Sequence, residues 1–416
     1  MTASTDARFA RGAKFLAAGA AIALMATACG GGADTPEASG DSDAALKIGS
    51  LLPTTGALAF LGPPEIAGVN LAIKEINAAG GVNGKDVEVI HRDSGDTTTN
   101  IATQSTTDML GQGVSAIIGA ASSGVSKTVI NQITGAGVVH FSPANTSPDF
   151  TDWDDNNLFW RTAPSDVMQG KILGNFMVSQ GAANVGMIVL NDAYGTGLAS
   201  NIKGAVEGAG GTIVAESMFN EGDSQFSSQV DEVVAAKPDA IAIISFDQSK
   251  SIVPLLVQKG ITPEQMYFVD GNLSDYSKDF DKGTLEGAYG TQPGSFAKDD
   301  FKERLAEVDD SLEVWNYAGE SYDAANLVAL ASVAAGSTDG KAIAEKLQEV
   351  SVEGEKCTDF ASCKTLLDAG TDIDYDGISG PISFSEKGDV SEGIMGIYQY
   401  DEKNIPQPSK EEAGAV

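Results

Sequence analysis

The sequence comprises 416 residues, of which 42% are hydrophobic, and carries a formal net charge of −32 at pH 7. This length suffices for two domains of ordinary size and excludes a single small module. The acidic balance excludes a nucleic-acid-binding protein, because such a protein neutralises phosphates with clusters of Lys and Arg.

The first predicted element is an export signal. Arg8, Arg11 and Lys14 precede the apolar run "FLAAGAAIALMATA". The run has about the length of a secretory h-region and is too short to be a comfortable membrane span. The basic start and the apolar run therefore predict an exported protein.

Small residues lead from this run directly to Cys29, and a Gly/Ser/Asp-rich segment follows. The pattern resembles a bacterial lipoprotein signal, with 1–28 as the signal peptide, Cys29 as the lipidated N-terminus and 29–45 as a flexible tether. Ala26 stands where a lipobox more often has Leu. Ordinary signal-peptidase cleavage after the A-x-A site "ATA" is the alternative.

From Leu46 onward, short apolar runs alternate with amphipathic helical segments. A first series predicts strands at 46–53, 86–93, 114–120 and 138–144, with helices at 63–81, 99–113 and 124–137. A second series predicts helices at 167–181, 195–211, 226–236 and 249–260, with strands at 184–192, 212–219, 239–246 and 265–271. Two such series predict an α/β fold with two doubly wound, Rossmann-like lobes.

The C-terminal part begins with a helical block at 298–350 and ends with a strand pair at 380–400, whose turn contains Gly388 and Asp389. Between them lie Cys357 and Cys363, an even pair in an exported chain, which we interpret as a disulfide. No metal site is expected, because zinc would need further Cys or His ligands nearby.

Hydroxyl groups gather where two neighbouring strands of the first series end. Ser122, Ser123 and Ser126 follow one strand, and the segment "SPANTSP", which contains Ala144 and Thr146, follows the next. Ligands of an open α/β sheet bind beyond the carboxyl ends of its strands, where the N–H groups of the next helix are free. These groups can hold a carboxylate, although capping of the helices is the alternative role of the hydroxyls.

The second series offers complementary chemistry at its own strand ends. Tyr194 lies in "NDAYGTG" after one strand, and Asp270 lies in "FVDGN" after another. Each alone is ordinary loop or turn chemistry. Carboxylate donors on one lobe together with an acid and an aromatic group on the other are what a zwitterionic amino acid requires.

Catalytic and cofactor-binding functions find little support. His91 and His140 lie in no recognisable nucleophile motif, and "ASSG" is not G-x-S-x-G, so a hydrolase would lack its base. No dinucleotide fingerprint follows a strand, and no Walker A pattern is present. We therefore expect neither catalytic residues nor a cofactor.

The motifs as an ordered set resemble a known family. "LPTTGALAFLGPPEIAGVNLAIKEINAAGGVNGKDVEVIHRDSGD", "IIGAASSGVSKTV", "FSPANTSPDFT", "FWRTAPSD", "LNDAYGTGLA" and "GPISFSEKGDV" are similar to the periplasmic-type binding proteins of branched-chain amino-acid ABC uptake systems. The similarity extends from Leu46 to about Tyr400. It implies a type I fold with two lobes, three crossover strands and a ligand in the cleft between the lobes.

The resemblance also implies roles for single residues. It places the carboxylate-binding serine at Ser123, the carbonyl that accepts the ligand ammonium at Ala144 and the threonine at Thr146. It places the cleft tyrosine at Tyr194 and the ammonium-binding acid at Asp270, where relatives often have Glu.

Two positions bear on the choice of ligand. Leu61 stands where leucine-type binders place an aromatic residue, and Phe246, in "ISFDQ", lies in a strand-end loop and is a further candidate ligand-binding residue. The expected ligand is a branched-chain or related amino acid, and amides, urea-like compounds or aromatic carboxylates are the alternative. Asp270 disfavours a simple monocarboxylate, because its charge would lack an ammonium to pair with.

The expected domains are 46–162 plus 293–378 for the first lobe, 163–292 plus 379–405 for the second, and a tail at 406–416. The resemblance implies an extracytoplasmic monomer, anchored to the bacterial membrane by its lipid, that delivers its ligand to the permease subunits of an ABC transporter. A sensor ectodomain is disfavoured because no second hydrophobic span follows Tyr400.

Overall fold

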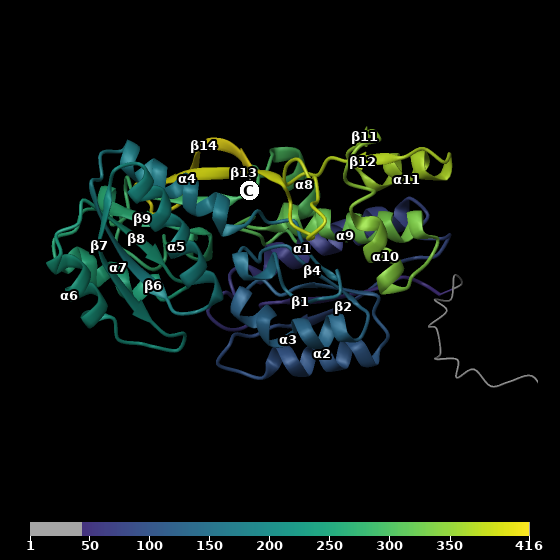
Figure 1. The fold of residues 1–416 in the computed structure, drawn as a ribbon, viewed down its shortest axis with the longest axis horizontal. Coiled ribbons are helices and arrows are strands. Elements are labelled where there is room, and N and C mark those ends of the chain that lie inside the picture. Colours follow the sequence, from purple (N-terminus) through teal and green to yellow (C-terminus); the bar gives the residue numbers. More distant parts are fainter. Residues whose placement is uncertain (1–43, 416) are drawn as a thin grey trace, which may run out of the picture. The chain divides into compact units, whose positions relative to one another are not determined.

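The computed structural model describes residues 44–415, which form two α/β lobes built on largely parallel sheets (Figure 1). The predicted signal peptide, Cys29 and most of the predicted tether lie outside these residues. Within 44–415, no helix combines the length and the apolar character needed to cross a membrane. The α/β fold predicted from the alternation of strands and helices is confirmed.

The first lobe contains a five-stranded parallel sheet in the order β2-β1-β3-β4-β5. Its strands are β1 (Lys47–Leu52), β2 (Glu88–Asp93), β3 (Ala116–Gly119), β4 (Val139–Ser142) and β5 (Phe159–Arg161). Helices α1 (Gly62–Ala78), α9 (Ala318–Ala335) and α10 (Gly340–Leu347) cover one face, and α2 (Ile101–Gly111) and α3 (Ser123–Gly135) cover the other (Figure 1). Because both faces are covered, β3 and β4 are buried along their whole length.

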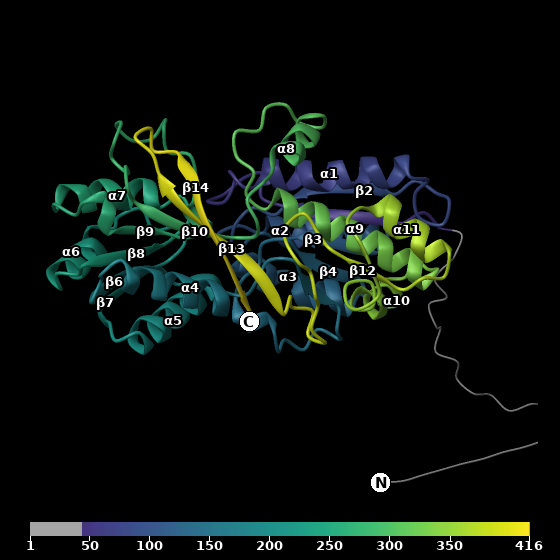
Figure 2. The ribbon, with the colours of Figure 1, turned by 90° about the horizontal axis from the view of Figure 1, so that it is seen from above.

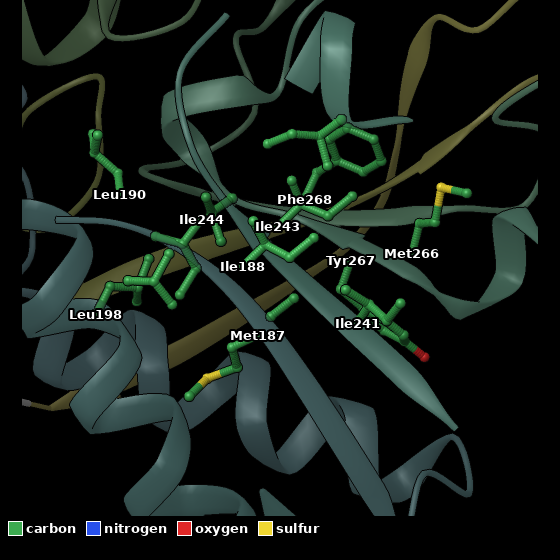
Figure 3. Packing of buried hydrophobic residues seen from close by; sticks show 14 of the residues in the cluster. Met187, Ile188, Leu190, Leu198, Ile241, Ile243, Ile244, Met266, Tyr267 and Phe268 are labelled. Carbon is green, nitrogen blue, oxygen red and sulfur yellow. The ribbon is translucent and has the colours of Figure 1, made fainter. Parts of the chain in front are cut away.

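The second lobe contains a seven-stranded sheet in the order β14-β13-β10-β9-β8-β6-β7. Its parallel strands are β6 (Asn184–Leu190), β7 (Thr212–Phe219), β8 (Ala240–Ile244), β9 (Met266–Phe268) and β10 (Tyr289–Pro293). Its helices are α4 (Asp166–Ser179), α5 (Ala193–Gly208), α6 (Ser227–Ala235) and α7 (Ser249–Gln258). Figure 3 shows how side chains of β6, β8 and β9 pack with Leu198 of α5 to form the core.

Strand order places the binding region of each lobe. In the first sheet the order reverses between β1 and β3, and in the second it reverses between β6 and β8. At such a point the loops leave neighbouring strands in opposite directions and open a crevice. The loops after β3 and after β6 carry Ser122, Ser123 and Tyr194, and the loops after β4 and β9 carry Thr146 and Asp270.

The C-terminal edge of the second sheet differs from the prediction. The expected tail at 406–416 contains β14 (Pro406–Ala415), which pairs antiparallel with β13 (Glu392–Tyr400) (Figure 2). The sequence predicts that a strand around Phe384 pairs with β13, but Phe384 forms only an isolated bridge with Val390. Gly388 and Asp389 do lie in the turn between them, where the Ser385 N–H donates to the Asp389 carbonyl.

Three connections join the lobes, at 162–165, 294–298 and 376–391, and we call them the hinge. The third passes to the second lobe later than the boundary predicted at 378. Ile382, Phe384 and Val390 are buried in the core of the first lobe, because their apolar side chains pack beside Phe141 and Trp160. The segment up to Val390 therefore belongs to the first lobe.

The remaining elements of the first lobe include those that hold the cysteine pair. They are α8 (Asp299–Ala306), α11 (Phe360–Asp368) and a two-stranded parallel sheet of β11 (Glu355–Cys357) and β12 (Ile373–Tyr375). Cys357 and Cys363 form a disulfide, as predicted, and their Cα atoms are 5.3 Å apart. The bond joins the end of β11 to α11.

Candidate functional site

A small cavity lies between the lobes, at the strand ends where the order of each sheet reverses. Its first-lobe lining is Leu58, Leu61, Ala121, Ser122, Ser123, Ala144 and Tyr317. Its second-lobe lining is Tyr194, Phe246, Asp270 and Gly271. Seven of the eight predicted ligand-binding residues thus meet at one cavity, and Thr146 is the exception.

The first-lobe wall is the beginning of α3. Ser122 caps this helix, and its Oγ accepts a hydrogen bond from the Val125 N–H at 3.3 Å. The capping role that was the alternative is therefore present for Ser122, whereas the Ser123 Oγ accepts a hydrogen bond from the Ser147 N–H of the loop after β4 at 3.4 Å. The first N–H groups of a helix lack intrahelical partners and carry partial positive charge, so this wall suits a carboxylate.

The loop after β4 places Ala144 at the cavity, and hydrogen bonds from a buried side chain hold this loop in position. Arg161, which is fully buried, donates to the backbone carbonyls of Asn145 and Ser147 at 3.2 and 2.8 Å. Its Nε also lies 2.5 Å from Oδ1 of Asp389, in a buried ion pair. Thr146 is fully buried behind the cavity, where its carbonyl accepts a hydrogen bond from the Asp166 N–H at 2.7 Å.

Aromatic side chains form much of the second-lobe wall. The ring of Tyr194, in the first turn of α5, stacks on Phe246 with the centroids 5.6 Å apart. Gly271 allows the next loop to approach closely, because a Cβ there would lie 2.9 Å from the Phe246 ring. These rings and the first-lobe residues Leu58 and Leu61 belong to one buried cluster.

Asp270 follows β9 and places its carboxyl group in the cavity, although the side chain is only 4% exposed. Its Oδ1 accepts hydrogen bonds from Tyr194 Oη at 2.7 Å and from Gln169 Nε2 at 2.9 Å. Its Oδ2 accepts a hydrogen bond from Tyr317 Oη at 2.7 Å. These three neutral donors orient the carboxyl group. No cation among the described residues forms an ion pair with it.

The electrostatics of the cleft favour a positively charged ligand group. Burial raises the pKa of Asp270, and hydrogen bonds from Tyr317, Tyr194 and Gln169 oppose this rise. Burial also raises the pKa of Asp166 well above its usual range, and the neighbouring Asp270 raises it further. An ammonium beside Asp270 would relieve the cost of ionising it.

Tyr317 and Gln169 contact Asp270 but were not predicted from the sequence. Tyr317 is the N-cap residue of α9 in the left-handed conformation, with φ of 57°, and Gln169 lies in the first turns of α4. Nothing in the local pattern distinguishes Tyr317 from the nearby Trp315 or Tyr322. Only the fold brings it to Asp270.

The arrangement is that of a binding site. It combines helix N–H groups on one wall, a buried acid on the opposite wall and apolar side chains between them. Within 44–415, no group of three His, Cys, Asp or Glu residues is placed to hold a metal ion. His91 and His140 do not line the cavity.

Comparison with known proteins agrees with this geometry. The family described as "Periplasmic binding protein" matches residues 45–403. The chain is 27% identical to the chemotactic signal transduction system substrate-binding protein BasB of Halobacterium salinarum, over 82% of this chain and 83% of that one. It is 25% identical to a leucine-, isoleucine-, valine-, threonine-, and alanine-binding protein of Pseudomonas aeruginosa, over 85% of this chain and 90% of that one.

A solved structure shares the fold. The branched-chain amino acid transporter substrate-binding protein LivJ of Streptococcus pneumoniae, in complex with isoleucine, superposes with a TM-score of 0.71. The two sequences are 23% identical, and the match covers 90% of this chain and 100% of that one.

Proposed function

The chain belongs to the periplasmic binding protein family, and on this premise we propose that it captures a branched-chain or related α-amino acid in the interlobe cavity. The ligand carboxylate would lie against the start of α3, beside Ser122 and Ser123. Its ammonium would lie between the Ala144 carbonyl and Asp270, and its side chain would contact Leu61 and Phe246.

The position of Asp270 carries this proposal. A buried carboxyl group that faces a cavity without a cationic partner is costly to keep ionised, and a ligand ammonium supplies the missing charge. The helix start opposite offers the complementary donors for a carboxylate. A zwitterion matches both walls, whereas a simple carboxylate matches only one.

Calorimetry with truncated ligands tests the proposal. L-Leucine carries both charged groups, 4-methylpentanoate lacks the ammonium and isoamylamine lacks the carboxylate, while the three share the same branched end. We expect leucine or a close relative to bind, and both truncated compounds to bind at least tenfold more weakly. If 4-methylpentanoate binds as tightly as leucine, the ammonium assignment at Asp270 is wrong.

Amides and aromatic carboxylates are the second candidate class. The stacked rings of Tyr194 and Phe246 provide a surface on which an aromatic ligand could pack. Mass spectrometry of ligand retained through native purification separates the classes. Retention of an amide or a benzoate-type acid, and not of an amino acid, would favour this second class.

The remaining proposals concern cellular context. We propose that Cys29 is lipidated, that the protein is a monomer anchored to the outer face of the cell membrane, and that it delivers its ligand to ABC permease subunits. Mass spectrometry of the mature N-terminus tests the anchor, because a diacylglyceryl group on Cys29 is absent after ordinary signal-peptidase cleavage.

A further inference from the structure

A second cavity lies against the hinge, with a volume of about 210 Å³. Its lining comes from two of the three hinge connections, from the segment that leads into α9, and from the β13–β14 edge. Among the described residues, Tyr317 is the one residue that lines both this cavity and the interlobe cavity.

An unbalanced acid lies in the lining. Glu320, in the first turn of α9, is 5% exposed and forms no ion pair with any residue in 44–415. Burial raises its pKa to about 8, and Asp323 acts in the same direction. The other titratable groups close to it are Glu65, Tyr317 and Tyr398, none of which is a cation. No cation among the described residues is therefore placed to stabilise its ionised form.

A second polar group in the lining lacks a partner. Gln292 is 5% exposed, and its Oε1 accepts a hydrogen bond from Asn316 Nδ2 at 2.8 Å. Its Nε2 forms no hydrogen bond with any described residue. Buried amide groups are nearly always paired, so this N–H donor is a polar point in the lining that still lacks an acceptor.

Aromatic rings make up the apolar part. Phe296 and Tyr398 contact each other edge to face, with the centroids 5.0 Å apart. The Lys302 Nζ lies 4.5 Å from the centroid of the Trp315 ring, so a cation already occupies one aromatic face at this cavity. That lysine is also 3.8 Å from Asp299, which balances part of its charge.

We propose that this cavity is a second binding site, which takes a small organic ammonium with an apolar body. The ammonium pairs with Glu320, and the body packs among Phe296, Trp315 and Tyr398. An aromatic surface attracts an organic cation through its ring quadrupole, and a buried acid without a partner selects a cation over a neutral compound.

The site is separate from the interlobe cavity. Tyr317 forms part of both linings, since its hydroxyl reaches Asp270 while other atoms of the residue face the hinge. The adjacent Asn316 closes the wall with hydrogen bonds to Gln292 and to the Leu273 carbonyl. A ligand in the hinge cavity therefore does not occupy the place of the amino acid.

Titration with 2-phenylethylamine tests the proposal, and 2-phenylethanol serves as the uncharged control. We expect the amine to bind one to one, to change the fluorescence of Trp315, and to bind at least tenfold more tightly than the alcohol. The Glu320→Gln variant keeps the shape of the side chain and should lose this tenfold preference. Calorimetry near pH 7 in two buffers of different ionisation enthalpy should show proton release, because binding ionises Glu320.

Two further variants keep the result interpretable. Asp270→Asn removes the acid of the interlobe cavity and should leave amine binding unchanged. Trp315→Ala removes a half-buried ring from the hinge cavity and should weaken amine binding. The proposal is overturned if the amine does not bind, or if Asp270→Asn abolishes binding while Glu320→Gln does not.

Discussion

The Tyr317 hydroxyl, at the start of α9 in the first lobe, donates a 2.7 Å hydrogen bond to Oδ2 of Asp270, at the end of β9 in the second lobe. Both residues are buried, and they are separated by 47 positions in the chain. The bond crosses the cleft directly above the cavity. It stabilises the closed arrangement of the lobes in addition to any contact with a ligand.

Tyr317→Phe should shift the ligand-free protein towards an open state. The substitution keeps the ring and removes a hydrogen bond to a carboxyl group, which is worth about 1 to 3 kcal/mol. We expect a larger radius of gyration in small-angle X-ray scattering. Tyr276→Phe is the matched control, because its hydroxyl bonds Ser249 and the Asn272 carbonyl within the second lobe. An unchanged radius for Tyr317→Phe would contradict the closing role.

Asp270→Asn should leave the fold nearly intact and weaken amino-acid binding. The loss expected is about 2 to 4 kcal/mol, the scale for removing one partner of a buried charged pair. Asp247→Asn, in the exposed loop after β8, controls for the general loss of negative charge. Calorimetry with the natural ligand decides the matter, since wild-type affinity in Asp270→Asn would exclude an ammonium at this position.

Ser123→Ala should have a smaller effect on the same measurement. We expect a loss of about 1 to 3 kcal/mol, because the N–H groups at the start of α3 remain to hold the carboxylate. Ser126→Ala is the control on the same helix, since its buried Oγ lies 3.2 Å from the Ala120 nitrogen and outside the cavity lining. It should lower the melting temperature without changing affinity. A lowered melting temperature with unchanged affinity in Ser123→Ala would assign Ser123 a purely structural role.

His140 should make stability depend on pH in the acid range. Burial lowers its pKa to about 3, from an ordinary value of 6.5. As the pH falls below 6.5 the unfolded chain binds a proton first, so stability is lost progressively down to about pH 3. Relative to His140→Phe, the wild type should lose about 2 to 3 kcal/mol between pH 7 and pH 4. Urea unfolding at several pH values measures this, and parallel curves for the two proteins would refute it.

Reduction of the disulfide should cost modest stability. Cys357 and Cys363 close a short loop, for which loop-closure entropy predicts about 2 kcal/mol. We expect dithiothreitol to lower the melting temperature of the wild type. It should not change the melting temperature of the double variant Cys357→Ser/Cys363→Ser. Two free thiols in the unreduced, denatured protein would show that the bond is absent.

The sequence was sufficient to predict the residues that directly follow strands. Ser122, Ser123, Tyr194 and Asp270 each come within a few positions of the end of a parallel strand. The hydrophobic pattern predicts those strands, and parallel strands bring their carboxyl ends to one edge. The order of elements thus brings each pair to one edge of its own sheet, whereas the meeting of the two edges at a cleft was implied by the resemblance to the binding-protein family.

Contacts between distant segments could not be predicted in this way. Tyr317 reaches Asp270 only because the hinge brings α9 over the cleft, and its left-handed backbone conformation has no sequence signal in a tyrosine. The strand β14 was missed for a different reason. Its sequence "PQPSKEEAGA" is polar and contains two prolines, and most of its residues are exposed, so it lacks the alternation that marks a half-buried strand.

The antiparallel edge formed by β14 also determines where the chain can be shortened. A chain that stops at residue 405 would lose the outer partner of β13 and leave unpaired those backbone N–H and C=O groups of "EGIMGIYQY" that face β14, while the pairing with β10 remains. An apolar strand with a free edge readily pairs with a second copy. In the intact protein the outermost strand carries Lys410, Glu411 and Glu412, and charged side chains at a sheet edge oppose such pairing. The polar sequence of β14 therefore protects the second lobe against self-association.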